Sequence, residues 1–189
     1  DYVNSTELAI KAQNDFGASF RLLVEGLRES KIGEIKYPDA NSTLRLTYGK
    51  VRSLPADKRN DATINNYTTL AGQVKKYKKG DLEFDLPERV LQMNAAKDFG
   101  RYADKDGSLH VNFLTDNDIT GGNSGSPVLN GKGELIGLAF DGNIEAMAGD
   151  VIFDKNLQRT INVDIRYVLY VMKYIGKTDR LIDELNVKL

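Results

Sequence analysis

The chain has 189 residues, with 26 basic and 27 acidic side chains and a formal net charge of −1. This length corresponds to one ordinary domain, or to one domain and a piece of another, and the balanced charge argues against a globally basic nucleic-acid-binding protein. No apolar run approaches 18 residues, so we expect no membrane-spanning helix. Cysteine is absent and His110 is the one histidine, which excludes disulfides, thiolate chemistry and a histidine-rich metal site. We therefore expect no metal and no cofactor.

The residue pattern of the N-terminal part predicts a helix followed by a strand. Apolar residues at three- and four-residue spacings predict helix over residues 6–12 and 20–27, and alternating apolar and polar residues predict a half-buried strand over residues 42–48. The polar, lysine-rich stretch from about residue 55 to 80 is interpreted as a surface excursion with marginal structure. Its basic run, residues 75–79, is interpreted as a solvated loop.

The second half predicts a β-rich middle and a helical end. Pro87, followed by an acidic residue, opens a helix. The glycine-rich residues 130–133 predict a hairpin between two strands. The predicted strands cover residues 109–114, 127–129, 134–140 and 160–163, and the final helices cover residues 165–175 and 179–185. The expected fold is therefore mainly β with flanking helices, and the composition break near residue 42 predicts a domain junction.

The segment Thr120–Leu129 has the composition that nucleophilic chemistry requires. It reads Thr-Gly-Gly-Asn-Ser-Gly-Ser-Pro-Val-Leu. A nucleophilic serine must protrude from a tight turn, and glycine permits the backbone angles that such a turn needs. The N–H groups of Gly122 and Ser124 could then point at one developing oxyanion. A plain glycine-rich hairpin loop is the alternative interpretation.

The full string resembles the nucleophile segment of trypsin-like serine peptidases in its bacterial form, Gly-x-Ser-Gly-Ser-Pro. Beyond this string, the chain is similar to the bacterial dipeptidyl-peptidases 7 and 11 from about residue 36 to its C-terminus. The matching segments include residues 37–41, 44–49, 96–102, 140–143, 158–161 and 163–169. This resemblance implies that Ser124 is the nucleophile and Gly122 an oxyanion-hole donor. It also implies that residues 1–42 end an inserted helical domain and that residues 43–189 form the second β-barrel of a chymotrypsin-like fold with its closing helices.

The same resemblance implies two substrate-binding residues. Asp141 matches an aspartate that anchors the free amino group of a peptide, a role that suits a carboxylate beside an ammonium. Gly142 matches the position that sorts the family by specificity: arginine there selects Asp or Glu, whereas glycine leaves an uncharged pocket for apolar or aromatic side chains. Both residues have a simpler interpretation as turn residues. Asp118 has the spacing from Ser124 at which trypsin-like enzymes place the acid that binds Lys or Arg, but we interpret it as an exposed loop aspartate.

None of the residues assigned so far can act as the general base. A serine hydroxyl needs a base at hydrogen-bond distance, oriented by a third group. The resemblance places the catalytic histidine and aspartate upstream, on the first barrel. His110 lies in a predicted strand between apolar Leu109 and Val111, and we interpret it as structural or solvent-facing.

The expected function is therefore that of the C-terminal part of a serine dipeptidyl aminopeptidase that acts on peptides and is inactive without its upstream part. The resemblance further implies a homodimeric enzyme of the bacterial periplasm or cell envelope, and the balanced charge argues against a nucleic-acid partner. Two alternatives remain open: a glutamyl endopeptidase-like protease, and a non-enzymatic binding module with a trypsin-like fold.

Overall fold

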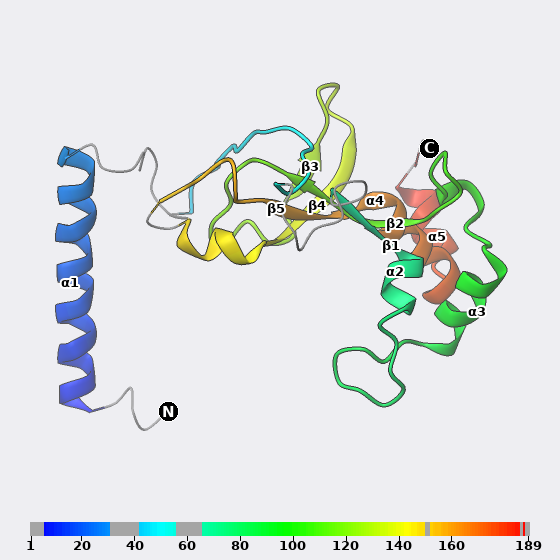
Figure 1. Cartoon of the computed structure of the whole chain (residues 1–189), viewed down its shortest axis with the longest axis horizontal. Coiled ribbons are helices and arrows are strands. Elements are labelled where there is room, and N and C mark those ends of the chain that lie inside the picture. The colour runs from blue at the N-terminus through cyan, green and yellow to red at the C-terminus, as the bar shows by residue number, and fades with distance from the viewer. Residues whose placement is uncertain (1–5, 31–41, 56–65, 150–151, 186, 188–189) are drawn as a thin grey trace.

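The computed structural model describes residues 6–30, 42–55, 66–149, 152–185 and 187. Its centre is a five-stranded sheet of order β1-β2-β5-β4-β3 in which every neighbouring pair is antiparallel (Figure 1). The strands are β1 (Tyr67–Thr69), β2 (His110–Thr115), β3 (Pro127–Leu129), β4 (Leu135–Gly142) and β5 (Thr160–Asp164). The predicted β-rich middle is confirmed, and so is its hairpin, since Asn130 N–H donates to the Glu134 carbonyl (3.0 Å) between β3 and β4.

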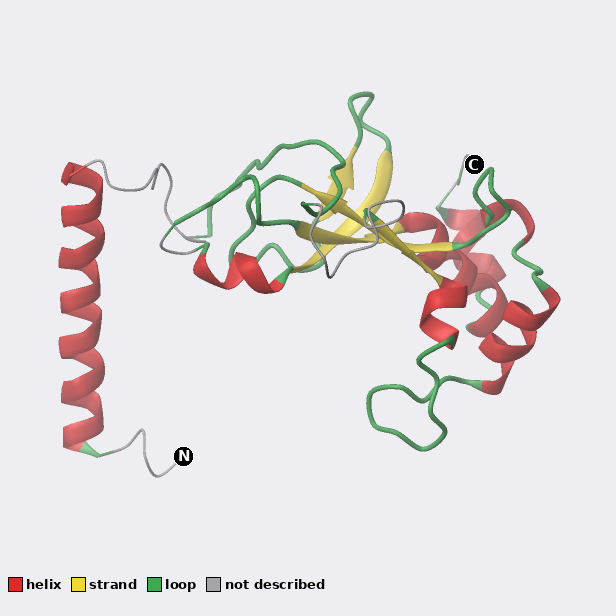
Figure 2. Cartoon of the chain, viewed as in Figure 1, coloured by secondary structure: helices red, strands yellow, loops and turns green. Residues whose placement is uncertain are grey.

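Most of the helices gather at one end of the sheet (Figure 2). The α-helices are α1 (Glu7–Ser30), α2 (Leu70–Val74), α3 (Glu88–Ala96), α4 (Ile165–Tyr170) and α5 (Asp179–Glu184). Short 3-10 turns form η2 (Gly100–Tyr102) and η3 (Ile144–Ala148), and a π-helical turn, η4 (Val171–Ile175), continues α4. Within the described ranges, no helix has the length and apolar character needed to cross a membrane.

The hydrophobic core lies at the helical end of the sheet rather than beside the Gly-Ser segment. Tyr170 of α4 is fully buried at its centre, with the Phe99 and Tyr102 rings edge-on to it at centroid distances of 6.1 and 6.4 Å. Such edge-to-face pairs add to the stabilisation that burial itself provides. The buried members are Leu70, Val90, Met93, Phe99, Tyr102, Leu109, Leu169 and Tyr170.

The predicted N-terminal helix is confirmed as one continuous helix, α1. None of its residues is buried, and the apolar side chains Leu8 and Phe16 are 78% and 71% exposed. In Figure 1, α1 stands apart from the sheet. The predicted domain junction near residue 42 adjoins residues 31–41, which lie outside the described residues, so the division into residues 1–42 and 43–189 stays a prediction.

The predicted strand over residues 42–48 is wrong. This segment has no strand partner among the described residues, and Leu44 and Leu46 are 102% and 89% exposed. Alternation alone does not make a strand, because a strand also needs a neighbour that satisfies its backbone. The chain joins the sheet only afterwards, where Lys50 N–H donates to the buried Asp116 carboxylate (2.7 Å) and Val51 forms an isolated bridge with Thr115.

The interpretation of residues 55–80 as marginally structured is also wrong for its second half; residues 56–65 lie outside the described residues. Residues 67–74 form β1 and α2, and Leu70 at their junction is fully buried. Thr69 ends the strand and caps the helix, because its hydroxyl accepts a hydrogen bond from Gly72 N–H (3.2 Å). The lysines of the basic run that follows are exposed, as predicted.

Replacing Leu70 by alanine tests this correction. We expect the free energy of unfolding to fall by about 2–5 kcal/mol, because a fully buried leucine loses its packing and leaves a cavity. Urea unfolding of the purified chain, followed by circular dichroism, measures the change. Leu44→Ala is the matched control: its side chain is fully exposed, so we expect a change within about 0.5 kcal/mol. Equal effects of the two substitutions would contradict the placement of Leu70 in the core.

Candidate active site

Two consecutive tight turns shape the segment around Ser124. Asn123 N–H donates to the Thr120 carbonyl (3.1 Å), and Ser126 N–H donates to the Asn123 carbonyl (2.9 Å). The third residue of each turn is a glycine with positive φ, 94° at Gly122 and 81° at Gly125. Positive φ at that position is the geometry of a type II turn, which glycine adopts without strain. The pattern Gly-Asn-Ser-Gly therefore has a local reason, and it leaves Ser124 at an exposed corner.

The second turn is attached to strand β4. Gly125 N–H donates to the Ala139 carbonyl (2.7 Å), and Ala139 N–H donates to the Ser126 carbonyl (2.8 Å). The Ser124 hydroxyl donates to the carbonyl oxygen of Phe140, at 3.4 Å. The structure thus brings Ser124 beside the stretch of β4 that continues directly into Asp141 and Gly142, although Asp141 lies 17 positions after Ser124 in the sequence.

The two predicted oxyanion donors lie in the exposed part of this loop. Within the described part of the chain, the backbone N–H groups of Gly122 and Ser124 have no hydrogen-bond acceptor, and both residues are exposed. Free N–H groups beside a serine hydroxyl are what stabilisation of a tetrahedral oxyanion requires.

Asp141 and Gly142 end β4 next to the short turn η3. The Asp141 carboxylate is exposed, and its Oδ1 accepts a hydrogen bond from Gly142 N–H (2.8 Å), which leaves Oδ2 available to a cation. Gly142 is in close contact with η3, since a Cβ built there would lie 2.7 Å from the Ala146 Cβ. A side chain at position 142 therefore requires Ala146 to move.

Arg45 is a residue of this site that the sequence interpretation missed. Its guanidinium donates to the Thr120 hydroxyl (2.6 Å), the Asn123 side-chain oxygen (3.2 Å) and the Gly121 carbonyl (3.4 Å). Arg45 lies 75 residues before Thr120, within the segment predicted as a strand, and no local pattern connects the two.

The structure confirms a structural role for His110 and does not bring it to Ser124. Its ring stacks on Tyr67 at a centroid distance of 3.9 Å, and its nitrogens lie 3.6 Å from Asp104 and 3.9 Å from Asp106. Its side chain is only 14% exposed, so it is not solvent-facing. No hydrogen bond joins Ser124 to an imidazole or a carboxylate among the described residues. The base that would activate Ser124 is therefore not contributed by the chain's single histidine.

An ion-pair network surrounds His110. Arg166 donates to Asp104 (2.7 Å) and to Asp164, the N-terminal capping residue of α4 (2.8 Å). The Arg166 guanidinium holds the pKa of the Asp104 carboxyl below its usual range. The stabilisation from this pair is consequently present above the pKa of the unfolded carboxyl and is lost as pH falls through the folded value.

Two other aspartates lie in the segment before Thr120, and one of them, Asp118, differs from the sequence interpretation. Asp118 is partly buried rather than exposed, and its carboxylate lies beside Gly149, where a built Cβ would be 3.6 Å away. Asp116 is only 1% exposed and lies 3.5 Å from Arg52 and 3.9 Å from Lys155, so it anchors residues 50–52 to the end of β2.

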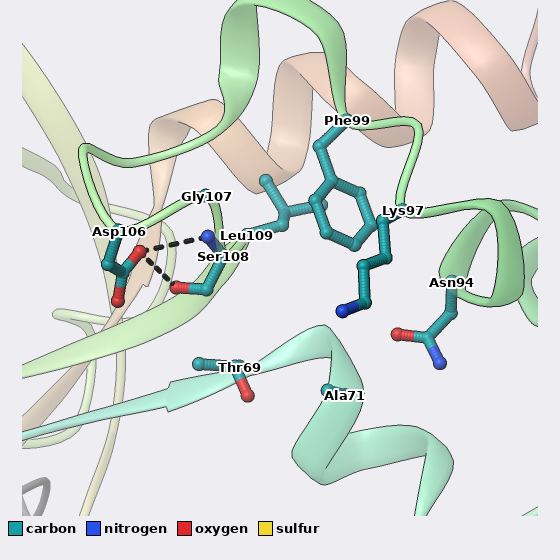
Figure 3. Close-up of a pocket in the computed structure, with 9 residues that line it drawn as sticks. All are labelled: Thr69, Ala71, Asn94, Lys97, Phe99, Asp106, Gly107, Ser108 and Leu109. Atoms are coloured by element: carbon teal, nitrogen blue, oxygen red, sulfur yellow. Dashed lines mark hydrogen bonds between the residues drawn. The ribbon is translucent and has the colours of Figure 1, made fainter.

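A pocket of about 280 Å³ lies at the helical end of the molecule and not at Ser124. Figure 3 shows it between α2, the end of α3 and the loop before β2, with the Lys97 side chain reaching into it. None of the predicted site residues lines it. No cluster of metal-ligating side chains occurs in the ranges that the structure describes.

Comparison with known proteins identifies the family. Residues 7–187 match the Peptidase S46 family. This chain belongs to that family. The peptidase S46 relatives include Dipeptidyl-peptidase 7 of Capnocytophaga gingivalis, 63% identical over 98% of this chain and 26% of the relative. They also include the Asp/Glu-specific dipeptidyl-peptidase of the same organism, 46% identical over 85% of this chain and 22% of the relative.

Solved structures of dipeptidyl-peptidases also match this chain. The crystal structure of Porphyromonas endodontalis DPP11 in complex with the dipeptide Arg-Glu superposes with a TM-score of 0.76 and 41% identity, over 85% of this chain and 23% of that one. The chain thus spans about a quarter of the length of the peptidase S46 relatives that it matches. The resemblance to dipeptidyl-peptidases 7 and 11 expected from the sequence is confirmed.

Proposed function

We propose that this chain is the C-terminal part of a serine dipeptidyl aminopeptidase, with Ser124 as its nucleophile. The observation that carries the proposal is the attachment of the Ser124 turn to β4, where the serine hydroxyl contacts the Phe140 carbonyl directly before Asp141 and Gly142. The nucleophile, the free N–H donors and an exposed carboxylate are thereby brought together near the C-terminal end of β4. Membership of the peptidase S46 family, whose relatives are named dipeptidyl-peptidases, supports this assignment.

In the proposed mechanism, Ser124 attacks the carbonyl carbon of the second peptide residue. The bond to the third residue then breaks, its amine leaves with the proton taken from Ser124, and an acyl-enzyme remains. Water hydrolyses this acyl-enzyme, which releases the dipeptide and restores the serine hydroxyl. The N–H groups of Gly122 and Ser124 stabilise the oxyanion of the tetrahedral intermediate. Asp141 binds the substrate's terminal ammonium and so fixes the cut two residues from the free N-terminus. The histidine that takes the serine proton, and the aspartate that orients it, come from the part of the enzyme upstream of these residues.

The architecture of the whole enzyme is part of the same proposal. Residues 43–189 form the second barrel of a trypsin-like catalytic domain, and residues 1–42 end a helical domain inserted between its two barrels. The exposed apolar side chains of α1 and of Leu44 and Leu46 support this division, because such surfaces need a cover in the folded protein. The enzyme acts as a homodimer in the periplasm or cell envelope.

The substrate preference follows from Gly142. With glycine there, the pocket presents no charge to the second substrate residue, and apolar or aromatic side chains fit best. Relatives named Dipeptidyl-peptidase 7 reach 63% identity, against 46% for an Asp/Glu-specific relative, which agrees with this choice. The glutamyl endopeptidase-like alternative is disfavoured by the same relatives, which are dipeptidyl-peptidases.

Fluorogenic dipeptide amides test the proposal. The full-length enzyme is expected to release fluorophore from substrates with an apolar or aromatic second residue at a kcat/KM at least tenfold above that for Asp or Glu. The isolated 189-residue chain is expected to show no turnover, because it lacks the base. Fast hydrolysis by the isolated chain would contradict the missing base, and a preference for Asp or Glu would contradict the role of Gly142.

The contact between Gly142 and Ala146 makes a sharper specificity prediction. Gly142→Arg alone places its Cβ 2.7 Å from the Ala146 Cβ, so we expect it to lose activity on apolar substrates without gaining Asp or Glu activity. Adding Ala146→Gly removes that contact, and we expect the double variant to cleave after Glu at least tenfold faster than the single one. Steady-state kcat/KM values for a matched Leu and Glu substrate pair measure both changes. Equal Glu activity of the two variants would rule out the coupling.

A further inference from the structure

We propose that Arg45 is a positioning residue for the oxyanion hole, holding the peptide group that carries the Gly122 N–H. This inference rests on the proposed peptidase function and adds a residue to its machinery. Arg45 is partly buried, whereas its neighbours Leu44 and Leu46 are fully exposed, so it is the side chain of this extended stretch that turns toward the Ser124 loop.

The three contacts of the guanidinium fix the first turn from both ends. Nη1 binds the Thr120 hydroxyl at 2.6 Å, while Nη2 binds the Asn123 side-chain oxygen at 3.2 Å and the Gly121 carbonyl at 3.4 Å. The Asn123 oxygen also accepts a hydrogen bond from Thr120 N–H (3.1 Å), so Arg45 completes a closed polar ring around the turn.

The contact with the Gly121 carbonyl determines where the next N–H points. The Gly121–Gly122 peptide bond is trans, and in a trans peptide group the C=O and N–H bonds point in opposite directions. A carbonyl held by Arg45 therefore directs the Gly122 N–H away from Arg45, toward the exposed side of the loop. A rotation of this peptide group by half a turn would replace the oxyanion donor with a carbonyl oxygen.

Packing does not hold this peptide group in place. Gly121 and Gly122 are exposed, and a Cβ built on Gly121 would meet nothing within 4 Å. Two adjacent glycines have the widest choice of backbone angles, so their orientation depends on hydrogen bonds. The planar fork of arginine can bind several oxygens at fixed angles, and a lysine ammonium cannot reproduce this.

The test compares Arg45→Ala and Arg45→Lys with wild type in the full-length enzyme. We expect kcat on a dipeptide amide to fall by about 10²-fold for Arg45→Ala, the size of the loss of an oxyanion donor, with KM changed less than about threefold. Affinity for a dipeptide boronate, whose adduct with Ser124 presents an oxygen to the hole, should fall in proportion to kcat. Affinity for the product dipeptide should not change. Guanidinium ion added to Arg45→Ala should restore part of kcat.

Arg52→Ala is the matched control, because Arg52 lies on the same segment but pairs with Asp116 instead of the loop. It should keep wild-type kcat. Should Arg45→Ala fail to fold, Thr120→Val removes the 2.6 Å contact from the other side and should lower kcat by about tenfold. Wild-type kcat and boronate affinity in Arg45→Ala, or in Thr120→Val, would overturn the proposal. If Ser124→Ala retains activity, the assignment of Ser124 as the nucleophile, on which the proposed function rests, has failed, and the two failures are therefore distinguishable.

Discussion

Ser124→Ala is expected to lower kcat of the full-length enzyme by at least about 10⁴-fold, the largest effect of any substitution in this chain. Without the hydroxyl no acyl-enzyme forms, and removal of a catalytic serine alone costs nearly as much as removal of a whole triad. Hydrolysis of a fluorogenic dipeptide amide measures the loss, and a fluorophosphonate probe, which reacts only with an activated serine, should no longer label the protein.

Ser126→Ala is the matched control for this prediction. Ser126 lies in the same loop, and its hydrogen bonds to Asn123 and Ala139 use only backbone atoms, which alanine retains. We expect its kcat to stay within about threefold of wild type. Labelling and activity that survive in Ser124→Ala would show that another residue is the nucleophile. Absence of both activity and labelling in the wild-type full-length protein would favour the non-enzymatic binding module.

Asp141→Asn is expected to lower kcat/KM for peptides with a free N-terminus by about 10²–10³-fold. The substitution keeps the shape of the side chain and its oxygen for Gly142 N–H, but it removes the negative charge that pairs with the substrate ammonium. Loss of one partner of a buried, hydrogen-bonded charge pair costs roughly 2–5 kcal/mol, and this range applies if the bound substrate covers the Asp141 carboxylate. Steady-state kinetics on one dipeptide amide measure it.

The control for Asp141 is a second exposed acid nearby. Among the described residues, the Glu145 carboxylate in η3 accepts a hydrogen bond only from the Asn143 side-chain amide (2.7 Å), so Glu145→Gln should leave kcat/KM within about threefold. Similar losses in both variants would point to general electrostatic attraction of the cationic substrate rather than to a specific ammonium anchor at Asp141.

The parts of the fold that the sequence predicts best are those with local causes. The turn glycines Gly122 and Gly125 have the positive φ values that their turn positions require. The hairpin that begins at Asn130 forms at the glycine-rich residues that predict it. The α1 helix likewise follows from its own periodicity, even though none of its residues is buried. In each case the conformation is determined within a few residues.

The features that could not be predicted from the sequence depend on residues that lie far away along the chain. Residues 42–48 alternate as a strand does, yet whether Leu44 and Leu46 are covered depends on a neighbour that the alternation does not specify. Leu70 is buried in one hydrophobic cluster with residues of α3 and α4, which lie far along the chain. Arg45 enters the site through contacts across 75 to 78 residues, and no spacing rule marks it.

Product analysis on a matched peptide pair is the most direct test of the central proposal. The full-length enzyme should be incubated with one peptide in two forms, with a free and with an acetylated N-terminus, and the products followed by mass spectrometry. We expect successive dipeptides from the free peptide, with apolar or aromatic residues at their C-terminal position, and no cleavage of the acetylated form. Internal cleavage of both peptides at the same bond would contradict a dipeptidyl aminopeptidase and would identify an endopeptidase.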